Sequence, residues 1–228
     1  TDCNIIDKDY LKIIEATLHF FQKREIPFYH KARHDGILRH LVVRKGEATG
    51  EFLINLVTTS EINFSLEEYQ QELLSLRLEG SICGILHTQN DSFADIVQSD
   101  QTTIVYGRDY LLEKLFDLEF KVTAFSFFQT NSKGAEVLYG IVKDFAGEAQ
   151  NKTVFDFYCG TGTIGQIMAK KAKKVIGIEL IEEAVAAANE NAQRNGLLNC
   201  TFIAGDVLQK VEELQEKPDL IIVDPPRD

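Results

Sequence analysis

Apolar and polar residues follow two different patterns along this chain, and the change lies near residue 125. Before it, apolar runs that partly alternate with polar residues are interrupted by two helical patterns. After it, short apolar runs take turns with longer helical patterns. A period of two indicates half-buried strands, whereas strands that take turns with helices predict a parallel sheet. We therefore expect an α+β domain over 1–124 and an α/β domain over 125–228.

Two helices are predicted in the first domain. Asp7 is suited to cap a helix that runs to about Arg24. Ser65 and Glu68 form a capping box for a second helix over 66–78. The apolar residues expected on the buried face of the first helix are Leu11, Ile14, Leu18 and Phe21.

The strands of the first domain are predicted to form a mostly antiparallel sheet. Apolar runs at 38–43 and 52–57 flank a turn at 46–50, which indicates a β-hairpin. The other apolar runs predict strands over 81–90, 102–106, 110–115 and 120–123.

The first domain also holds the densest group of basic residues in the chain. The group comprises Lys31, Arg33, His34, Arg39, His40, Arg44 and Lys45. It is either the solvated face of the hairpin or a local patch that binds RNA phosphates, with Arg39 among the candidate RNA contacts.

A glycine loop opens the second domain. Gly160, Gly162 and Gly165 follow a predicted strand and precede a helix that starts near Thr163. Backbone N–H groups at such a loop can approach an anionic group. That group is either the pyrophosphate of a dinucleotide or the carboxylate of S-adenosylmethionine.

Four acidic residues lie at or near the predicted strand ends, namely Asp156, Glu179, Asp206 and Asp224. Asp156 precedes the glycines and is placed to receive the methionine ammonium, and Tyr158 is placed to pack on the ligand. Glu179 ends the second strand, where a carboxylate accepts hydrogen bonds from ribose hydroxyls. Asp206 follows the third strand, and both a contact with the adenine amine and a helix N-cap are open for it.

The fourth strand of the second domain ends in a proline motif. Asp224-Pro225-Pro226-Arg227 follows the apolar run 220–223. Two prolines cannot continue a strand ladder, so the backbone turns at the ligand edge of the sheet. An acid followed by two prolines suits a planar base held beside a transferable methyl group. Together with the glycine loop, this motif favours a methyl donor over NAD.

An aromatic segment precedes the second domain. Residues 125–131 read FSFFQTN. The segment is either a hydrophobic linker packed under the next helix or a wall in which Gln129, Phe127 and Phe128 stack a base or the adenine ring. Asn131 is suited to cap the helix over 133–146.

Composition narrows the class of protein further. The formal net charge of −11 is unlike that of a basic nucleic-acid binder, so any RNA contact needs a local patch or another part of the protein. Four scattered cysteines, Cys3, Cys83, Cys159 and Cys200, indicate reduced thiols and a cytoplasmic protein. We expect no metal site formed by the residues of this chain alone. We also expect no membrane contact, because no run of eighteen apolar residues occurs.

At these motifs the sequence resembles the RNA uracil-5 methyltransferase family, whose members form 5-methyluridine in 23S ribosomal or transfer RNA. The matching stretches are FSFFQTN, DFYCGTGTIG, GIEL, AGD, DPPR and, in the first domain, LRHLVVRKG with TGE. The resemblance implies a partial class I S-adenosylmethionine-dependent methyltransferase domain of Rossmann-like fold, preceded by the central α+β domain of the family.

The resemblance also implies roles for individual residues. The implied contacts of S-adenosylmethionine are Gln129, Tyr158, Glu179, Asp206 and Asp224. Phe127 and Phe128 would line the path of a flipped uridine, with Pro225 at the base. Cys3 resembles the last cysteine ligand of a 4Fe-4S cluster found in some members, whose other ligands would lie upstream.

In that family a cysteine adds to carbon 6 of uracil and a glutamate removes the proton from carbon 5, and both lie after the DPPR motif. None of the four cysteines here occupies that place. A fourth strand at the end of the chain would leave an unpaired sheet edge. We therefore expect a fragment, truncated after the fourth strand and inactive by itself. The alternatives are a methyltransferase that acts on an exocyclic amine, an NAD-dependent oxidoreductase and a non-catalytic RNA-binding module.

Overall fold

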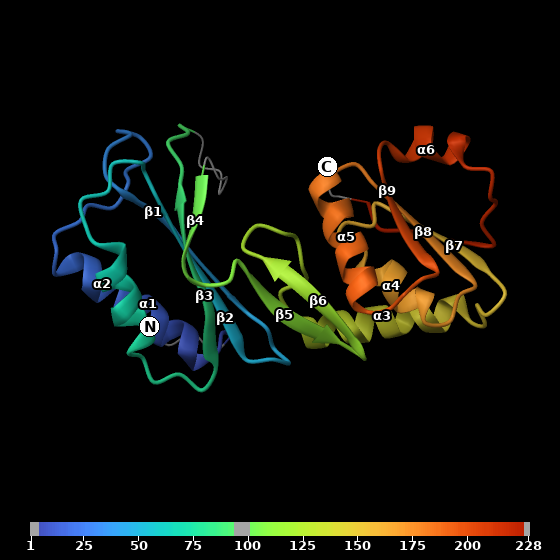
Figure 1. The fold of residues 1–228 in the computed structure, drawn as a ribbon, viewed down its shortest axis with the longest axis horizontal. Helices are drawn as coiled ribbons and strands as arrows, with labels where there is room; N and C mark the ends of the chain where they lie inside the picture. The colour runs from blue at the N-terminus through green and yellow to red at the C-terminus, as the bar shows by residue number, and fades with distance from the viewer. Residues whose placement is uncertain (1–4, 94–100, 226–228) are drawn as a thin grey trace. The chain divides into compact units, whose positions relative to one another are not determined.

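A computed structural model describes residues 5–93 and 101–225 of the chain (Figure 1). Its contacts divide the chain into two compact units, and each is described by itself. Unit 1 comprises Thr1–Leu112 and Thr123–Phe125, and unit 2 comprises Glu113–Val122 and Ser126–Asp228. Residues 113–122 thus group with the later part of the chain, whereas the domain boundary predicted from the sequence lies between 124 and 125.

Unit 1 is a four-stranded sheet with two helices on one face (Figure 1). The strand order is β1-β2-β3-β4, in which β1–β2 and β3–β4 are antiparallel and β2–β3 is parallel. The parallel pair requires a crossover, which α2 supplies. The elements are α1 (Lys8–Gln22), β1 (Leu38–Lys45), β2 (Glu51–Thr58), α2 (Leu66–Leu74), β3 (Ser81–Gln89) and β4 (Gln101–Gly107). The predicted hairpin and the predicted strands at 81–90 and 102–106 are confirmed, whereas the runs at 110–115 and 120–123 form a separate two-stranded sheet.

The predicted buried face of α1 is wrong except at one residue. The buried residues are Asp9, Ile13, Thr17, Phe20 and Phe21, whereas Leu18 is 38% exposed. Two polar residues, Asp9 and Thr17, lie on the buried face because each has a hydrogen-bond partner there. A search for apolar positions alone therefore misses this face. The Asp9 carboxylate accepts hydrogen bonds from the backbone N–H groups of Glu79 and Gly80, and the Thr17 hydroxyl is 2.9 Å from the Tyr69 hydroxyl.

Both predicted helix caps of unit 1 are confirmed. The Asp7 carboxylate accepts a hydrogen bond from the Asp9 N–H, and the Ser65 hydroxyl accepts one from the Glu68 N–H. α2 ends at Leu74, four residues before the predicted end at 78.

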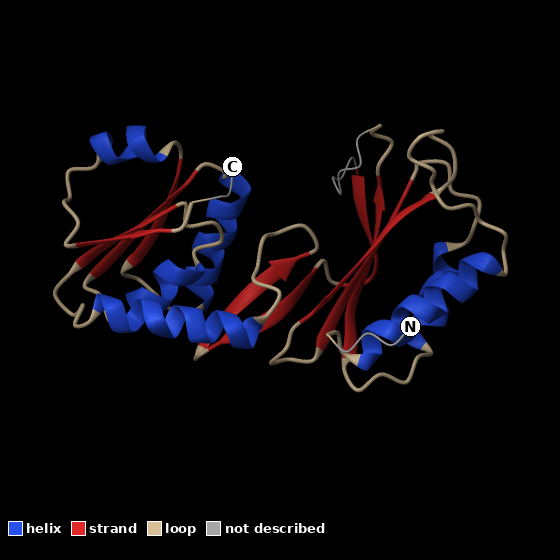
Figure 2. Cartoon of the chain, turned by 180° about the vertical axis from the view of Figure 1, so that it is seen from behind, coloured by secondary structure: helices blue, strands red, loops and turns tan. Residues whose placement is uncertain are grey.

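Unit 2 contains a parallel sheet between two helical layers. The strand order is β10-β7-β8-β9. Figure 2 shows α3, α4 and α5 on one face of this sheet and α6 on the other. The elements are α3 (Ser132–Ala146), β7 (Thr153–Phe157), α4 (Thr163–Ala169), β8 (Lys174–Glu179), α5 (Glu182–Arg194), β9 (Cys200–Ala204), α6 (Val207–Glu213) and β10 (Leu220–Val223). Both the fold class and the Asn131 cap of α3, which accepts from the Gly134 N–H, are confirmed.

Apolar side chains from the sheet and from α4 and α5 form the core of unit 2. Val154, Val175 and Ala188 are completely buried, and Phe202 is 4% exposed. The short side chains of α5 let that helix approach the sheet closely. The core therefore fixes the four strands under the loops that follow them.

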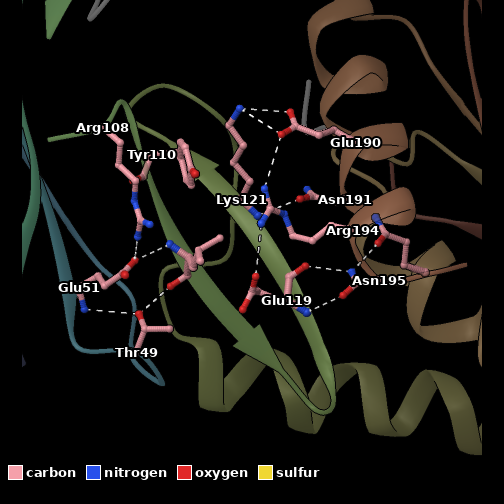
Figure 3. Close-up of polar contacts among 12 residues, drawn as sticks. Thr49, Glu51, Arg108, Tyr110, Glu119, Lys121, Glu190, Asn191, Arg194 and Asn195 are labelled. Atoms are coloured by element: carbon pink, nitrogen blue, oxygen red, sulfur yellow. Dashed lines mark hydrogen bonds and ion pairs between the residues drawn. The ribbon is translucent and has the colours of Figure 1, made fainter.

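A short β-ribbon leads from unit 1 into unit 2. Its strands are β5 (Tyr110–Leu115) and β6 (Leu118–Thr123). The β6 backbone is bound by Asn191 of α5 and by Asn195, the C-cap of that helix, as Figure 3 shows. Asn191 accepts from the Lys121 N–H, and Asn195 accepts from the Glu119 N–H and donates to the Glu119 carbonyl. The side-chain amides of α5 thus stand in for a neighbouring strand.

Candidate cofactor site

The four strands of unit 2 end at one edge of the sheet. In the parallel register Phe157 lies beside Ile178 and Val223, and Glu179 lies beside Ala204. The segments that follow the strands therefore meet at this edge, where ligands of open α/β sheets bind. Backbone hydrogen bonds join two of these segments to β8, because Cys159 N–H donates to the Ile178 carbonyl and Gly205 N–H to the Glu179 carbonyl.

The turn after β7 has an unusual backbone. Tyr158, Gly160 and Gly162 have φ angles of 59°, 53° and 73°, in the left-handed region. A Cβ atom at Gly160 would meet nothing within 4 Å, whereas one at Gly162 would lie 2.5 Å from the Phe202 ring. Gly160 therefore faces open space and Gly162 faces the protein interior. Tyr158 is 39% exposed beside them.

Glu179 points at this glycine turn. Its Oε2 accepts a hydrogen bond of 3.0 Å from the Gly160 N–H, and its Oε1 accepts one of 3.0 Å from the Ile181 N–H. Each carboxylate oxygen keeps further acceptor capacity. The arrangement holds a carboxylate beside open space at the strand edge, as the prediction for Glu179 requires.

Asp156 lies inside the protein rather than at the edge. It is 1% exposed, and its Oδ2 accepts a 2.8 Å hydrogen bond from the Gly165 N–H. The pKa of Asp156 is raised to about 7, chiefly by burial and also by the nearby Asp224 carboxylate, while the Gly165 N–H works against this rise. Because protein encloses this carboxyl group, direct contact with a ligand ammonium would require the loop to move.

Asp206 caps α6. Its Oδ1 accepts a hydrogen bond of 3.1 Å from the Gln209 N–H. The N-cap is therefore present in the structure. The side chain is exposed, and the contact with the adenine amine stays a prediction.

Tyr139 of α3 is a residue of this region that the sequence did not single out. It is 5% exposed. Burial raises the pKa of its hydroxyl, the Asp224 and Asp156 carboxylates raise it further, and a hydrogen bond with the Gln129 side chain lowers it. Tyr139 thus connects the predicted cofactor residue Gln129 with two carboxyl groups near the strand ends. An apolar pattern cannot reveal this role, because a tyrosine on the buried face of a helix looks like core.

The aromatic segment before α3 has one phenylalanine packed inside the protein and another exposed to solvent, so each of the two interpretations of the segment fits one of them. Phe128 is buried, and its ring centroid lies 5.9 Å from that of Phe120, as expected of a packed linker. Phe127 is 74% exposed and available to a ligand. Pro225 is also exposed. The contacts of these residues with substrate stay predictions.

Basic residues of the first domain have partners inside unit 1. Arg39 Nη1 donates to the carbonyls of Asn90 and Ser92, and its guanidinium lies 4.3 Å from the centre of the Tyr29 ring. Arg44 donates to the Thr123 carbonyl. Lys45 forms an ion pair with Asp7. These contacts favour a structural role for Arg39, Arg44 and Lys45 among the basic residues. The RNA contact of Arg39 stays a prediction.

The cysteines that the structure describes are free thiols. Burial raises the pKa of Cys83 to about 11 and that of Cys200 to about 12. Burial also raises the pKa of Cys159, with a further contribution from the Asp156 and Glu179 carboxylates. A thiol is a poor nucleophile, so none of these three is activated. Cys3, Pro226 and Arg227 lie outside the described residues.

Two further features concern only the described ranges 5–93 and 101–225. No helix there is long and apolar enough to cross a membrane. Within the same ranges, His, Cys, Asp and Glu side chains form no group of three or more that could hold a metal ion.

Comparisons with known proteins agree with this geometry. Residues 148–225 match the model of a family described as a methyltransferase domain. A protein of Clostridium tetani is 59% identical over 226 residues, and one of Clostridium acetobutylicum is 55% identical over 225 residues. Both carry the name "uncharacterized RNA methyltransferase". The matches cover 99% of this chain but 50% and 49% of those proteins, so the chain spans about half the length of these relatives.

A solved structure resembles the whole chain. It is the Pyrococcus abyssi tRNA (uracil-54, C5)-methyltransferase in complex with S-adenosyl-L-homocysteine, with a TM-score of 0.80 and 27% identity. The match covers 99% of this chain and 53% of that protein. The fold of unit 2 is therefore the Rossmann-like fold of S-adenosylmethionine-dependent methyltransferases.

Proposed function

We propose that this chain is the cofactor-binding part of an S-adenosylmethionine-dependent RNA methyltransferase that forms 5-methyluridine in transfer or ribosomal RNA. The observation that carries the proposal is the Glu179 carboxylate bound to the Gly160 N–H, beside open space where four parallel strands end. The names of the similar proteins and the reaction named for the P. abyssi enzyme support the RNA substrate and the uracil ring.

The residues at the strand edge suit an adenosyl methyl donor. Such a cofactor supplies a methyl group on a positively charged sulfur. Glu179 would accept hydrogen bonds from the ribose hydroxyls, and Gly160 would let the ligand approach the backbone. Tyr158 would pack on the ligand, and Asp206 has an exposed carboxylate for the adenine amine.

Two further residues would complete the cofactor site. Tyr139 is buried close to the side chain of Gln129 and to the Asp224 carboxylate. In our proposal Gln129 and Asp224 contact the cofactor. Asp156 shapes the loop from inside the fold through its bond to Gly165.

The residues that the structure describes do not account for methyl transfer to carbon 5 of uracil. That carbon becomes nucleophilic when a thiolate adds to carbon 6, and a base must then remove the proton from carbon 5. The three described cysteines are thiols at neutral pH. In the family that the sequence resembles, the cysteine and the base follow the DPPR motif, so we assign these steps to another part of the longer protein.

Calorimetry with this chain tests the cofactor. We expect binding of S-adenosylhomocysteine and no competition from NAD. Folded protein that binds NAD in preference, or that binds neither ligand, would contradict the proposed cofactor.

The substrate is tested with the longer protein that contains this chain. RNA with 5-fluorouridine at the target carries fluorine where the proton would leave, so the thioether to carbon 6 persists. We expect a covalent complex that denaturing electrophoresis detects. Methylation of an exocyclic amine without such a complex would show that the target is not carbon 5.

A further inference from the structure

One aromatic ring lies against three of the glycines near the cofactor site. Phe202 of β9 is 4% exposed. A Cβ atom added at Gly177 would lie 2.3 Å from its ring, one at Gly162 would lie 2.5 Å from it, and one at Gly165 would lie 3.2 Å from it. The first two distances are shorter than any contact that a real Cβ makes. These glycines therefore leave room for the Phe202 ring.

Gly160 differs from these three positions. A Cβ atom there would meet nothing within 4 Å. The glycines of the loop thus serve two purposes: Gly160 leaves room on the outside, and Gly162 leaves room for Phe202 on the inside.

The backbone of Phe202 is fixed by one side chain. Asn189 of α5 accepts a hydrogen bond of 3.1 Å from the Phe202 N–H and donates one of 2.9 Å to the Phe202 carbonyl. Asn189 also donates to the Val185 carbonyl of its own helix. Within the described sheet, β9 pairs with β8 on one side only. Asn189 therefore supplies the hydrogen bonds that a further strand would give, and it ties Phe202 to α5.

We propose that Phe202, held by Asn189, is a positioning residue for the cofactor loop. Its ring supports the turn at Gly162 from inside, so that the Gly160 N–H stays bound to Glu179 and the open space beside it keeps its shape. The inference rests on the proposed function, because it assigns the loop to S-adenosylmethionine. It adds a residue that touches no ligand and yet sets the affinity for one.

Phe202 also belongs to the core of unit 2, so the test must separate support of the loop from filling of the core. Phe120 of β6 is a suitable control because it is completely buried and none of the closest contacts of the glycines involves it. We expect Phe202→Leu and Phe120→Leu to lower the free energy of unfolding by similar amounts, since both remove apolar contacts from a core.

The two variants are then compared by the dissociation constant of S-adenosylhomocysteine, at a temperature at which both are fully folded. We expect Phe202→Leu to weaken binding by about tenfold or more and Phe120→Leu by less than about twofold. We expect Phe202→Met to recover most of the affinity, because an unbranched side chain can still reach the glycines. Equal affinities of the two leucine variants would overturn the inference.

Asn189 has a matched control in the same unit. Asn199 also donates to two backbone carbonyls, those of Ala169 and Ala172, but it does not bond to Phe202. We expect Asn189→Ala to weaken binding of S-adenosylhomocysteine as Phe202→Leu does and Asn199→Ala to leave it within about twofold of wild type. Loss of affinity in both alanine variants alike would contradict a specific role of Asn189.

A readout without cofactor keeps this inference distinct from the proposed function. Hydrogen exchange of the Gly160 amide reports its bond to Glu179. We expect faster exchange in Phe202→Leu and unchanged exchange in Phe120→Leu. If wild-type protein fails to bind S-adenosylhomocysteine, the proposed function fails, and the exchange of Gly160 still decides whether Phe202 supports the loop. Unchanged exchange in Phe202→Leu would refute that support.

Discussion

At the scale of single residues, a buried carboxyl group lies beneath the glycine loop after β7. Asp156 was expected at the strand end because of its place before the glycines, and the structure encloses it instead. Its partner is the Gly165 N–H, and a Cβ atom at Gly165 would lie 2.9 Å from Asp156 Oδ2. The third glycine of the motif therefore admits the carboxyl group of Asp156 as well as the ring of Phe202.

The raised pKa of Asp156 makes the stability of the protein depend on pH. The folded state holds a proton up to about pH 7, whereas the unfolded chain releases it near 3.8, the ordinary pKa of an aspartate. The folded state therefore binds more protons between these values, and stability falls as pH rises through this window and is level above it. Asn at this position does not titrate. We expect the stability of Asp156→Asn relative to wild type to rise by about 1.4 kcal/mol per pH unit within the window.

Urea unfolding of both proteins at pH 5, 6, 7 and 8 measures this difference. Asp35→Asn serves as a control because that carboxylate is largely exposed. If the difference in free energy of unfolding between Asp156→Asn and wild type stays constant over the pH series, the raised pKa of Asp156 is contradicted.

Glu179 gives a second prediction at this scale. Its two oxygens bind the loop and, in our proposal, the ribose. We expect Glu179→Ala to weaken binding of S-adenosylhomocysteine by about tenfold or more, because both sets of hydrogen bonds are lost. Glu182→Ala in the exposed first turn of α5 is the control, and calorimetry measures both. Equal affinities of the two variants would count against Glu179 as a ligand of the ribose.

Sequence patterns placed Glu179 at the end of a strand, where the structure also has it, and did not single out Tyr139. The end of a short apolar run is a reliable sign of a strand end, so a charged residue there could be assigned to the ligand edge. The roles of Tyr139 and Phe202 depend on which residues from other elements lie opposite them. No spacing along the chain contains that information.

At the scale of the elements, the β5–β6 ribbon is held by side chains rather than by another strand. Asn195 accepts from the Glu119 N–H, donates to the Glu119 carbonyl and also donates to the Gln166 side chain of α4. Ion pairs of Lys121 with Glu190 and of Arg194 with Glu119 surround these bonds (Figure 3). The strands were predicted from their apolar runs. Their attachment to α5 could not be predicted, because asparagines on a polar helix face usually indicate that the face is exposed to solvent.

We expect Asn195→Ala to lower the free energy of unfolding by about 1–3 kcal/mol, because it leaves the backbone groups of Glu119 and the Gln166 side chain without their partner. Asn151→Ala is the control, since Asn151 is exposed in a turn. Chemical denaturation measures both. A loss in Asn195→Ala no larger than that in the control would mean that water replaces these bonds fully.

A second polar group holds the other end of this ribbon within unit 1. Glu51 forms an ion pair with Arg108 and accepts a hydrogen bond from the Leu112 N–H, and the Thr49 hydroxyl donates to the Leu112 carbonyl (Figure 3). The TGE stretch was noted in the sequence only for its resemblance to a family. Its physical role here is to bind the first residues of β5.

At the scale of the whole molecule, charge sets what the chain can bind. The net charge of −11 opposes binding to RNA, and Arg39, Arg44 and Lys45 have partners within unit 1. RNA affinity depends mainly on unpaired cations near phosphates. In our proposal the RNA substrate therefore requires contacts beyond these residues, in agreement with relatives about twice as long as this chain.

We expect this chain alone to bind transfer RNA more weakly than the longer protein by at least about tenfold at 0.1 M salt. Filter binding between 50 and 200 mM salt measures the affinities of both. Affinity of the chain equal to that of the longer protein would show that unit 1 or unit 2 carries the main RNA surface.

The central claim is that the loops after β7, β8 and β10 bind an adenosyl methyl donor. The most direct measurement is a titration of the 15N-labelled chain with S-adenosylhomocysteine, followed by NMR of the assigned backbone amides. We predict that the largest shifts occur at Gly160, Leu180 and Asp224 and saturate together. Shifts confined to other parts of the chain, or no shifts in a folded protein, would contradict the claim.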